Sequence, residues 1–164
     1  MTISGCAKGN PNGGILHSNF NSSRGLEFAT YIADVLEHFK NEWEIEFQTF
    51  APFNEPYGLQ GIGVWDGETS AQEGCNMDRQ TMTDVIRQFH DTFTSRNIST
   101  ELSVSDETHI DTAVNVQNYF RDQNITQMVG KISVHGYWDS QSVRRDILYS
   151  NSVKDGHRLW MDEM

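Results

Sequence analysis

The chain has 164 residues, with 12 basic and 23 acidic side chains and a formal net charge of −11. This length supports one domain with a core of its own. The acidic charge disfavours nucleic acid or an anionic membrane as a partner, because like charges repel. No apolar run approaches the roughly 20 residues that span a bilayer, and two cysteines are too few for a disulfide framework.

The first half of the chain predicts one helix, one strand and a long loop. Helical spacing of apolar residues, beginning at Phe28, predicts a helix over residues 25–43. Residues 45–50 alternate and are rich in strand formers, and Pro52 ends this run. Residues 53–75 contain five glycines without periodicity, which is typical of the long loops that are often functional.

The second half alternates between strand and helix. Helices are expected over residues 78–94, 110–122 and 140–150, and strands over residues 99–104, 128–134 and 157–161. Asp78 or Asn76 is the candidate N-cap of the first of these helices, and Thr108 that of the second. Such alternation predicts parallel strands that are joined by right-handed helical crossovers.

Polar residues gather where each predicted strand ends. These groups are Asn54-Glu55, Asp106-Glu107, His135 and Asp162-Glu163. The carboxyl ends of parallel strands share one edge of the sheet, where sites form. Glu55 and Glu163 are therefore a candidate pair for glycosidic bond cleavage, which needs one acid and one further carboxylate. The alternative is that both are solvated glutamates, and Asp106 is interpreted as a residue that leads into the next helix.

Several motifs resemble a known enzyme family. The run 52–56, Pro-Phe-Asn-Glu-Pro, resembles the Asn-Glu-Pro signature of clan A retaining glycosidases. Together with Trp65 and the run 72–75, Gln-Glu-Gly-Cys, it is similar to glycoside hydrolase family 30, and most like its endo-β-1,6-galactanase branch. Residues 1–5, 135–137 and 159–163 resemble segments after the third, sixth and seventh barrel strands. The resemblance implies an α/β fold, a partial (β/α)8 TIM barrel from the end of strand 3 through strand 7.

The resemblance also implies a role for each candidate residue. Glu55 would be the general acid/base, protonated at rest, and Glu163 the nucleophile. Asn54 would bind the sugar 2-hydroxyl, and Tyr137 would donate a hydrogen bond to Glu163. The remaining residues expected to line the substrate cleft are Trp65, Glu73, His135 and Trp138. Neither a cofactor nor a metal is expected.

The expected function is retaining endo-hydrolysis of a β-linked polysaccharide, with β-1,6-galactan as the leading substrate. The expected partner is a polysaccharide or oligosaccharide substrate, and neither nucleic acid nor a membrane is expected. Two alternatives stay open, namely a non-catalytic carbohydrate-binding fragment, or a family-30 hydrolase acting on glucuronoxylan or β-1,6-glucan. The chain is interpreted as one incomplete catalytic domain over residues 1–164, an internal fragment without a second domain. The family's habits imply a secreted parent protein, although residues 1–5 lack the features of a signal peptide.

Overall fold

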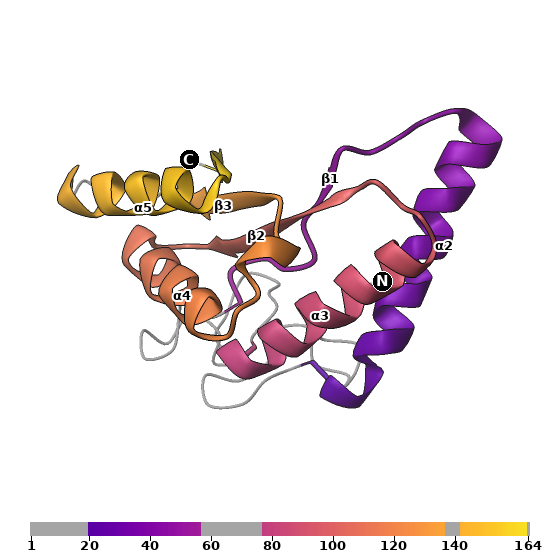
Figure 1. The fold of residues 1–164 in the computed structure, drawn as a ribbon, viewed down its shortest axis with the longest axis horizontal. Helices are drawn as coiled ribbons and strands as arrows, with labels where there is room; N and C mark the ends of the chain where they lie inside the picture. The colour runs from indigo at the N-terminus through magenta and orange to yellow at the C-terminus, as the bar shows by residue number, and fades with distance from the viewer. Residues whose placement is uncertain (1–19, 57–76, 137–141, 164) are drawn as a thin grey trace, which may run out of the picture.

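The computed structural model describes residues 20–56, 77–136 and 142–163, and it contains one parallel sheet (Figure 1). The strands lie in chain order as β1 (Thr49–Phe50), β2 (Glu101–Glu107), β3 (Lys131–His135) and β4 (Arg158–Glu163). All three neighbouring pairs are parallel. The alternation expected from the sequence is therefore confirmed for the described elements.

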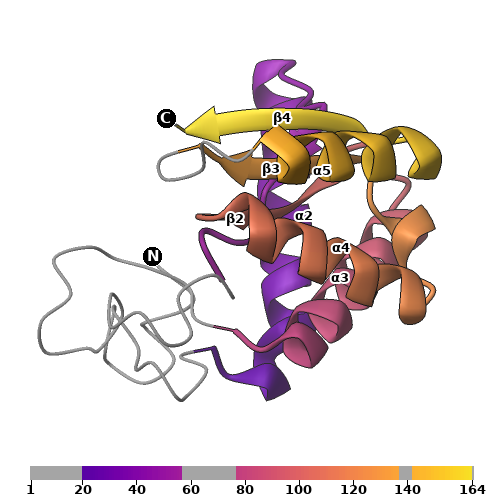
Figure 2. The same cartoon turned by 90° about the vertical axis from the view of Figure 1, so that its left-hand side faces the viewer.

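Helices connect the strands and cover one side of the sheet. They are α2 (Gly25–Trp43), α3 (Arg79–Ser95), α4 (Ile110–Asp122) and α5 (Ser142–Asp155), with short 3-10 turns η1 (Ser22–Arg24) and η2 (Thr126–Met128). α2 packs along α3 and α4 packs along α5, so the helices form two pairs (Figures 1 and 2).

The two central strands separate apolar from polar side chains by alternation, because successive residues of a strand point to opposite faces. Leu102 and Val104 of β2, with Ile132 and Val134 of β3, belong to the hydrophobic core shared with the helices. The intervening residues are polar and also buried, and Ser103 donates a hydrogen bond to Ser133 at 3.0 Å across the two strands. The sheet therefore has one apolar face and one polar face.

The first strand is shorter than expected from residues 45–50. Only Thr49 and Phe50 pair with β2, which begins at Glu101. Ile45 and Phe47 are 44% and 40% exposed. Phe47 lies against the Phe39 ring of α2 at a centroid distance of 5.1 Å. Residues 45–47 thus contact α2, whereas Gln48 still accepts a hydrogen bond from the Glu101 N–H at 2.9 Å.

The expected helix caps are confirmed at one site and wrong at another. Asp78 accepts a hydrogen bond from the Thr81 backbone N–H at 2.8 Å and caps α3. Thr108 does not cap α4, whose N-cap is the extended His109. β2 continues through Glu107 and α4 begins at Ile110 as expected, so the cap position falls on His109, one residue after Thr108.

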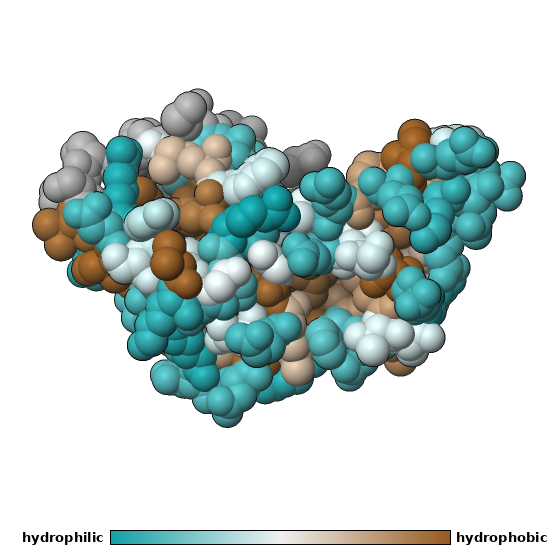
Figure 3. All heavy atoms as spheres, turned by 45° about the horizontal axis from the view of Figure 1, so that its top comes forward, coloured by the Kyte–Doolittle hydropathy of each residue, from teal (hydrophilic) through white to brown (hydrophobic). Residues whose placement is uncertain are grey.

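Apolar side chains are exposed at the two ends of the molecule (Figure 3). On α5 and β4 they are Val143, Ile147, Tyr149, Val153, Trp160 and Met161, and near the end of α2 they are Trp43, Ile45 and Phe47. Within the described residues, no helix combines the length and apolarity needed to cross a membrane.

Candidate active site at the carboxyl ends of the strands

Glu55 follows β1 and is held in a buried, unusual backbone conformation. Its side chain is 3% exposed, and its φ of 48° lies in the left-handed region. Its backbone N–H donates to the Asp106 carbonyl at 2.8 Å, which joins the loop after β1 to the end of β2. A non-glycine residue in this region costs on the order of 1–3 kcal/mol and persists only where its surroundings fix it, which is common at functional sites.

Asp106 is the extra residue of an irregularity in β2. Ser105 pairs with Ser133 and Glu107 pairs with Val134, so β2 has one more residue than β3 over this step. Asp106 also has a positive φ, 63°, and is 8% exposed. Such irregularities redirect a side chain next to a site, and here the Asp106 carboxylate lies beside the end of β3.

His135, the last residue of β3, lies among three carboxylates. Its Nδ1 is 2.9 Å from Oε1 of Glu55. Its Nε2 is 3.5 Å from Oδ2 of Asp106 and 3.6 Å from Oε1 of Glu163. These contacts join the four side chains into one cluster, and the imidazole at its centre has no solvent exposure.

The charge of the cluster follows from these contacts. Burial alone lowers the pKa of His135, since it penalises the cation. The Asp106 and Glu55 carboxylates, together with the charge of Glu163, outweigh that effect and raise the pKa of His135 to about 10. The ring is therefore an imidazolium at neutral pH, and each of its two nitrogens has a carboxylate oxygen within 3.6 Å.

A second cation lies deeper on the polar face. Lys131, at the start of β3, is 4% exposed. Its Nζ lies 3.8 Å from the centre of the Trp160 ring and 3.9 Å from Oδ2 of Asp162. Burial and the nearby Asp106 charge raise the pKa of Asp162, while Lys131 opposes this shift. Lys131 thus contacts Trp160 and Asp162, two residues of β4 that precede Glu163.

The structure brings together Glu55, Glu163 and His135 of the predicted site residues. Asn54 precedes Glu55 and is half-buried. The other four expected residues, Trp65, Glu73, Tyr137 and Trp138, lie outside the described residues. The sequence interpretation missed two members of this polar face, Asp106 and Lys131. The sequence placed Asp106 after a predicted strand, where site residues are common. No sequence pattern indicated that an irregularity in β2 would turn its side chain toward His135.

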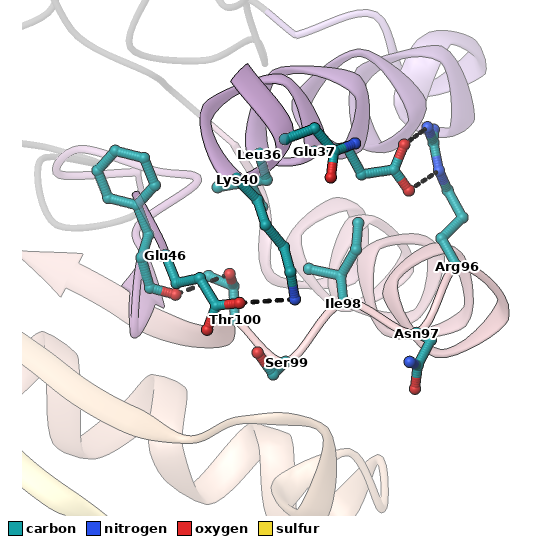
Figure 4. A pocket seen from close by; sticks show the side chains of 11 residues that line it. Leu36, Glu37, Lys40, Glu46, Arg96, Asn97, Ile98, Ser99 and Thr100 are labelled. Atoms are coloured by element: carbon teal, nitrogen blue, oxygen red, sulfur yellow. Dashed lines mark hydrogen bonds and ion pairs between the residues drawn. The ribbon is translucent and has the colours of Figure 1, made fainter. Parts of the chain in front are cut away.

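A cavity of about 250 Å³ lies at the opposite edge of the sheet, where β1 and β2 begin (Figure 4). Its charged lining is already paired within the chain. Lys40 lies 2.6 Å from Glu46, and Arg96 is bound to Glu37. Cations neutralised in this way offer little to a ligand, so the carboxyl ends of the strands remain the candidate active site.

No metal centre is evident in the part of the chain that the structure describes, since no group of three or more potential ligands has a suitable arrangement there. The carboxylates of the cluster instead face an imidazolium. The cluster is thus suited to holding and transferring protons.

The fold and the cluster together define an α/β protein with a parallel sheet and an acid–base site at the carboxyl ends of its strands. Residues 1–153 match the family model described as O-glycosyl hydrolase family 30. The chain therefore belongs to O-glycosyl hydrolase family 30, and the resemblance seen in its motifs is confirmed.

Similar proteins agree with this assignment. An endo-beta-1,6-galactanase from Hypocrea rufa is 36% identical over 158 residues, which are 96% of this chain and 32% of that protein. The chain thus spans about a third of the length of this curated relative.

Two solved structures share the fold. A conserved exported protein from Bacteroides fragilis has a TM-score of 0.64 at 18% identity, over 90% of this chain and 33% of that chain. The catalytic domain of GH30 xylanase C from Talaromyces cellulolyticus has a TM-score of 0.54 at 18% identity, over 69% of this chain and 24% of that chain.

Proposed function

We propose that the protein is a secreted retaining endo-glycoside hydrolase that cleaves a β-linked polysaccharide, with β-1,6-galactan as its substrate. One observation carries the proposal, namely that Glu55 and Glu163 contact the same imidazole at the carboxyl ends of parallel strands in a family-30 chain. The galactan substrate is favoured by the 36% identity to an endo-beta-1,6-galactanase. The four strands would form part of a (β/α)8 barrel.

The two glutamates have different surroundings, which suits different roles. Glu55 is 3% exposed, whereas the Glu163 side chain is 42% exposed. The more accessible Glu163 carboxylate would attack the anomeric carbon, while Glu55 would protonate the leaving oxygen. Glu55 would then take a proton from the water that hydrolyses the glycosyl–enzyme bond, which returns both carboxyl groups to their starting states.

Membership of family 30, whose motifs here resemble those of clan A retaining glycosidases, favours the retaining mechanism over the inverting one. Retention needs the carboxyl groups about 5–5.5 Å apart, whereas inversion leaves room for a water between them at roughly 6.5–9.5 Å. Asn54, directly before Glu55, would bind the 2-hydroxyl, and Tyr137 would donate to Glu163. Trp65, Glu73 and Trp138 would contribute to the cleft that binds the sugar chain.

The first experiment compares the full-length protein with variants on β-1,6-galactan, glucuronoxylan and β-1,6-glucan. We expect hydrolysis of the galactan, with a loss of roughly 10²–10⁴-fold for Glu55→Gln, which is the usual contribution of general acid catalysis. Glu163→Gln should lose at least as much. Glu42→Gln, an exposed change on α2, is the matched control and should retain wild-type activity.

The products and the substrates each allow the proposal to fail. NMR of the first product should show a β-anomer, since double displacement retains configuration. An α-anomer would contradict the retaining mechanism, and hydrolysis of glucuronoxylan or β-1,6-glucan alone would contradict the substrate. Binding of galactan without hydrolysis of any of the three polysaccharides would overturn the enzymatic function and favour a carbohydrate-binding protein.

A further inference from the structure

Asp106 makes two independent connections to the acid/base residue assigned above. Its backbone carbonyl accepts the Glu55 N–H at 2.8 Å. Its carboxylate lies 3.5 Å from Nε2 of His135, whose Nδ1 in turn lies 2.9 Å from Oε1 of Glu55. One residue thus holds the Glu55 backbone directly and contacts, through His135, the Glu55 carboxyl group.

The backbone conformation indicates that this arrangement is imposed by its surroundings. Asp106 and Glu55 both have positive φ, and they are joined by the backbone hydrogen bond between them. Asp106 is also the residue by which β2 exceeds β3, so the irregularity itself delivers the carboxylate to His135. A role in starting the next helix is excluded, since α4 begins at Ile110 with His109 as its N-cap.

We propose that Asp106 is a positioning residue that holds His135 oriented and protonated, so that the Nδ1–H of His135 donates to Oε1 of Glu55 and leaves the other Glu55 oxygen to carry the catalytic proton. The inference rests on the proposed glycosidase function and adds a third carboxylate to it. Glu163 contacts the same Nε2 at 3.6 Å but is the proposed nucleophile. During the glycosyl–enzyme intermediate, the Glu163 carboxylate is esterified and loses its charge. Asp106 then remains the charged partner of Nε2.

This role predicts a selective defect rather than a general one. A good leaving group departs from the anomeric carbon without being protonated, whereas a sugar leaving group needs a proton from the general acid. In Asp106→Asn, kcat/KM for the polysaccharide should fall about tenfold or more, within the roughly 10²–10⁴-fold that a general acid contributes. The kcat/KM for a 2,4-dinitrophenyl disaccharide of the same sugar should change several-fold less.

The matched control is Asp91→Asn. Asp91 also lies beside a histidine, with Oδ1 3.2 Å from Nδ1 of His90, but on the exposed surface of α3. This variant removes the same charge next to the same residue type, and we expect both kcat/KM values to stay at the wild-type level. Equal losses on the two substrates in Asp106→Asn would overturn the proposal, because a general structural defect lowers both.

A second readout follows His135 itself. In the full-length protein labelled with ¹⁵N-histidine, the His135 ring should show no titration between pH 5 and 8.5, because its pKa is about 10. Asp106→Asn should bring a titration midpoint into this range, whereas Asp91→Asn should not. An unchanged His135 signal in Asp106→Asn would overturn the proposal. Failure of the glycosidase function is recognised separately, since the wild-type protein would then hydrolyse none of the polysaccharides.

Discussion

Nδ1 of His135 lies 2.9 Å from Oε1 of Glu55, although 80 residues separate the two in the chain. Glu55 follows β1, His135 ends β3, and β2 lies between these strands in the sheet. A shift of β3 by one residue would turn His135 to the apolar face, because side chains alternate along a strand. The contact between His135 and Glu55 therefore depends on the register of β3 in the sheet.

The His135 cluster predicts a specific dependence of stability on pH. The folded state raises the pKa of His135 from 6.5 to about 10 through Glu55, Asp106 and Glu163. The stability that this protonation provides is full below about pH 6.5 and is lost as the pH rises toward 10. In urea unfolding experiments, the difference between wild type and His135→Gln should therefore shrink from pH 6 to pH 10. A difference that is independent of pH would contradict the assignment of an imidazolium.

Lys131→Met should destabilise the protein by about 1–2 kcal/mol, the range of a desolvated cation–π contact. The change removes the Nζ that lies 3.8 Å from the Trp160 ring centre and 3.9 Å from Asp162. The pKa of Asp162 should rise further, because Lys131 now opposes its shift. The deficit should be larger at pH 7 than at pH 4, where Asp162 is more protonated. Lys154→Met, an exposed change on α5, is the control, and an equal loss there would argue against this role.

Phe89 occupies the centre of the aromatic core. It is fully buried and packs against Phe28, Phe50 and Phe93, with centroid distances of 4.9, 5.4 and 5.5 Å. Phe89→Ala should lower the free energy of unfolding by about 3–5 kcal/mol, as is usual for a large-to-small change in a core. Phe47→Ala, at a 40% exposed position, should cost less than half as much in the same denaturant experiment. Similar losses would mean that the packing around Phe89 is not the main support of α3.

The cap of α3 gives a smaller and more local effect. Asp78 accepts hydrogen bonds from the Thr81 backbone N–H at 2.8 Å and from its hydroxyl at 3.0 Å. Asp78→Ala should cost about 1 kcal/mol in thermal unfolding, the typical value for loss of an N-cap. Asp91→Ala, at an exposed position within the same helix, should cost little or nothing. If Asp78→Ala left the thermal stability unchanged, α3 would be held by packing alone.

Local patterns were sufficient to predict most helices. α2 and α4 have the expected ends, because apolar residues at helical spacing mark both the element and its buried face. Strand ends were less accurate. Whether residues 45–48 pair depends on where β2 begins, and β2 lies about 50 residues further along the chain. A pairing partner at that distance leaves no mark on the local pattern.

The sequence by itself determined the family, the alternation of strands and helices, and the two glutamates as the candidate pair. These features depend on residue type and local order, which a motif or a period of two or 3.6 residues records directly. Only the tertiary structure decided that Asp106 contacts His135 rather than the start of α4, and that Lys131 lies under Trp160. Both outcomes depend on strand register and on one extra residue in β2, and the free energy that fixes them comes from packing between segments far apart in the chain.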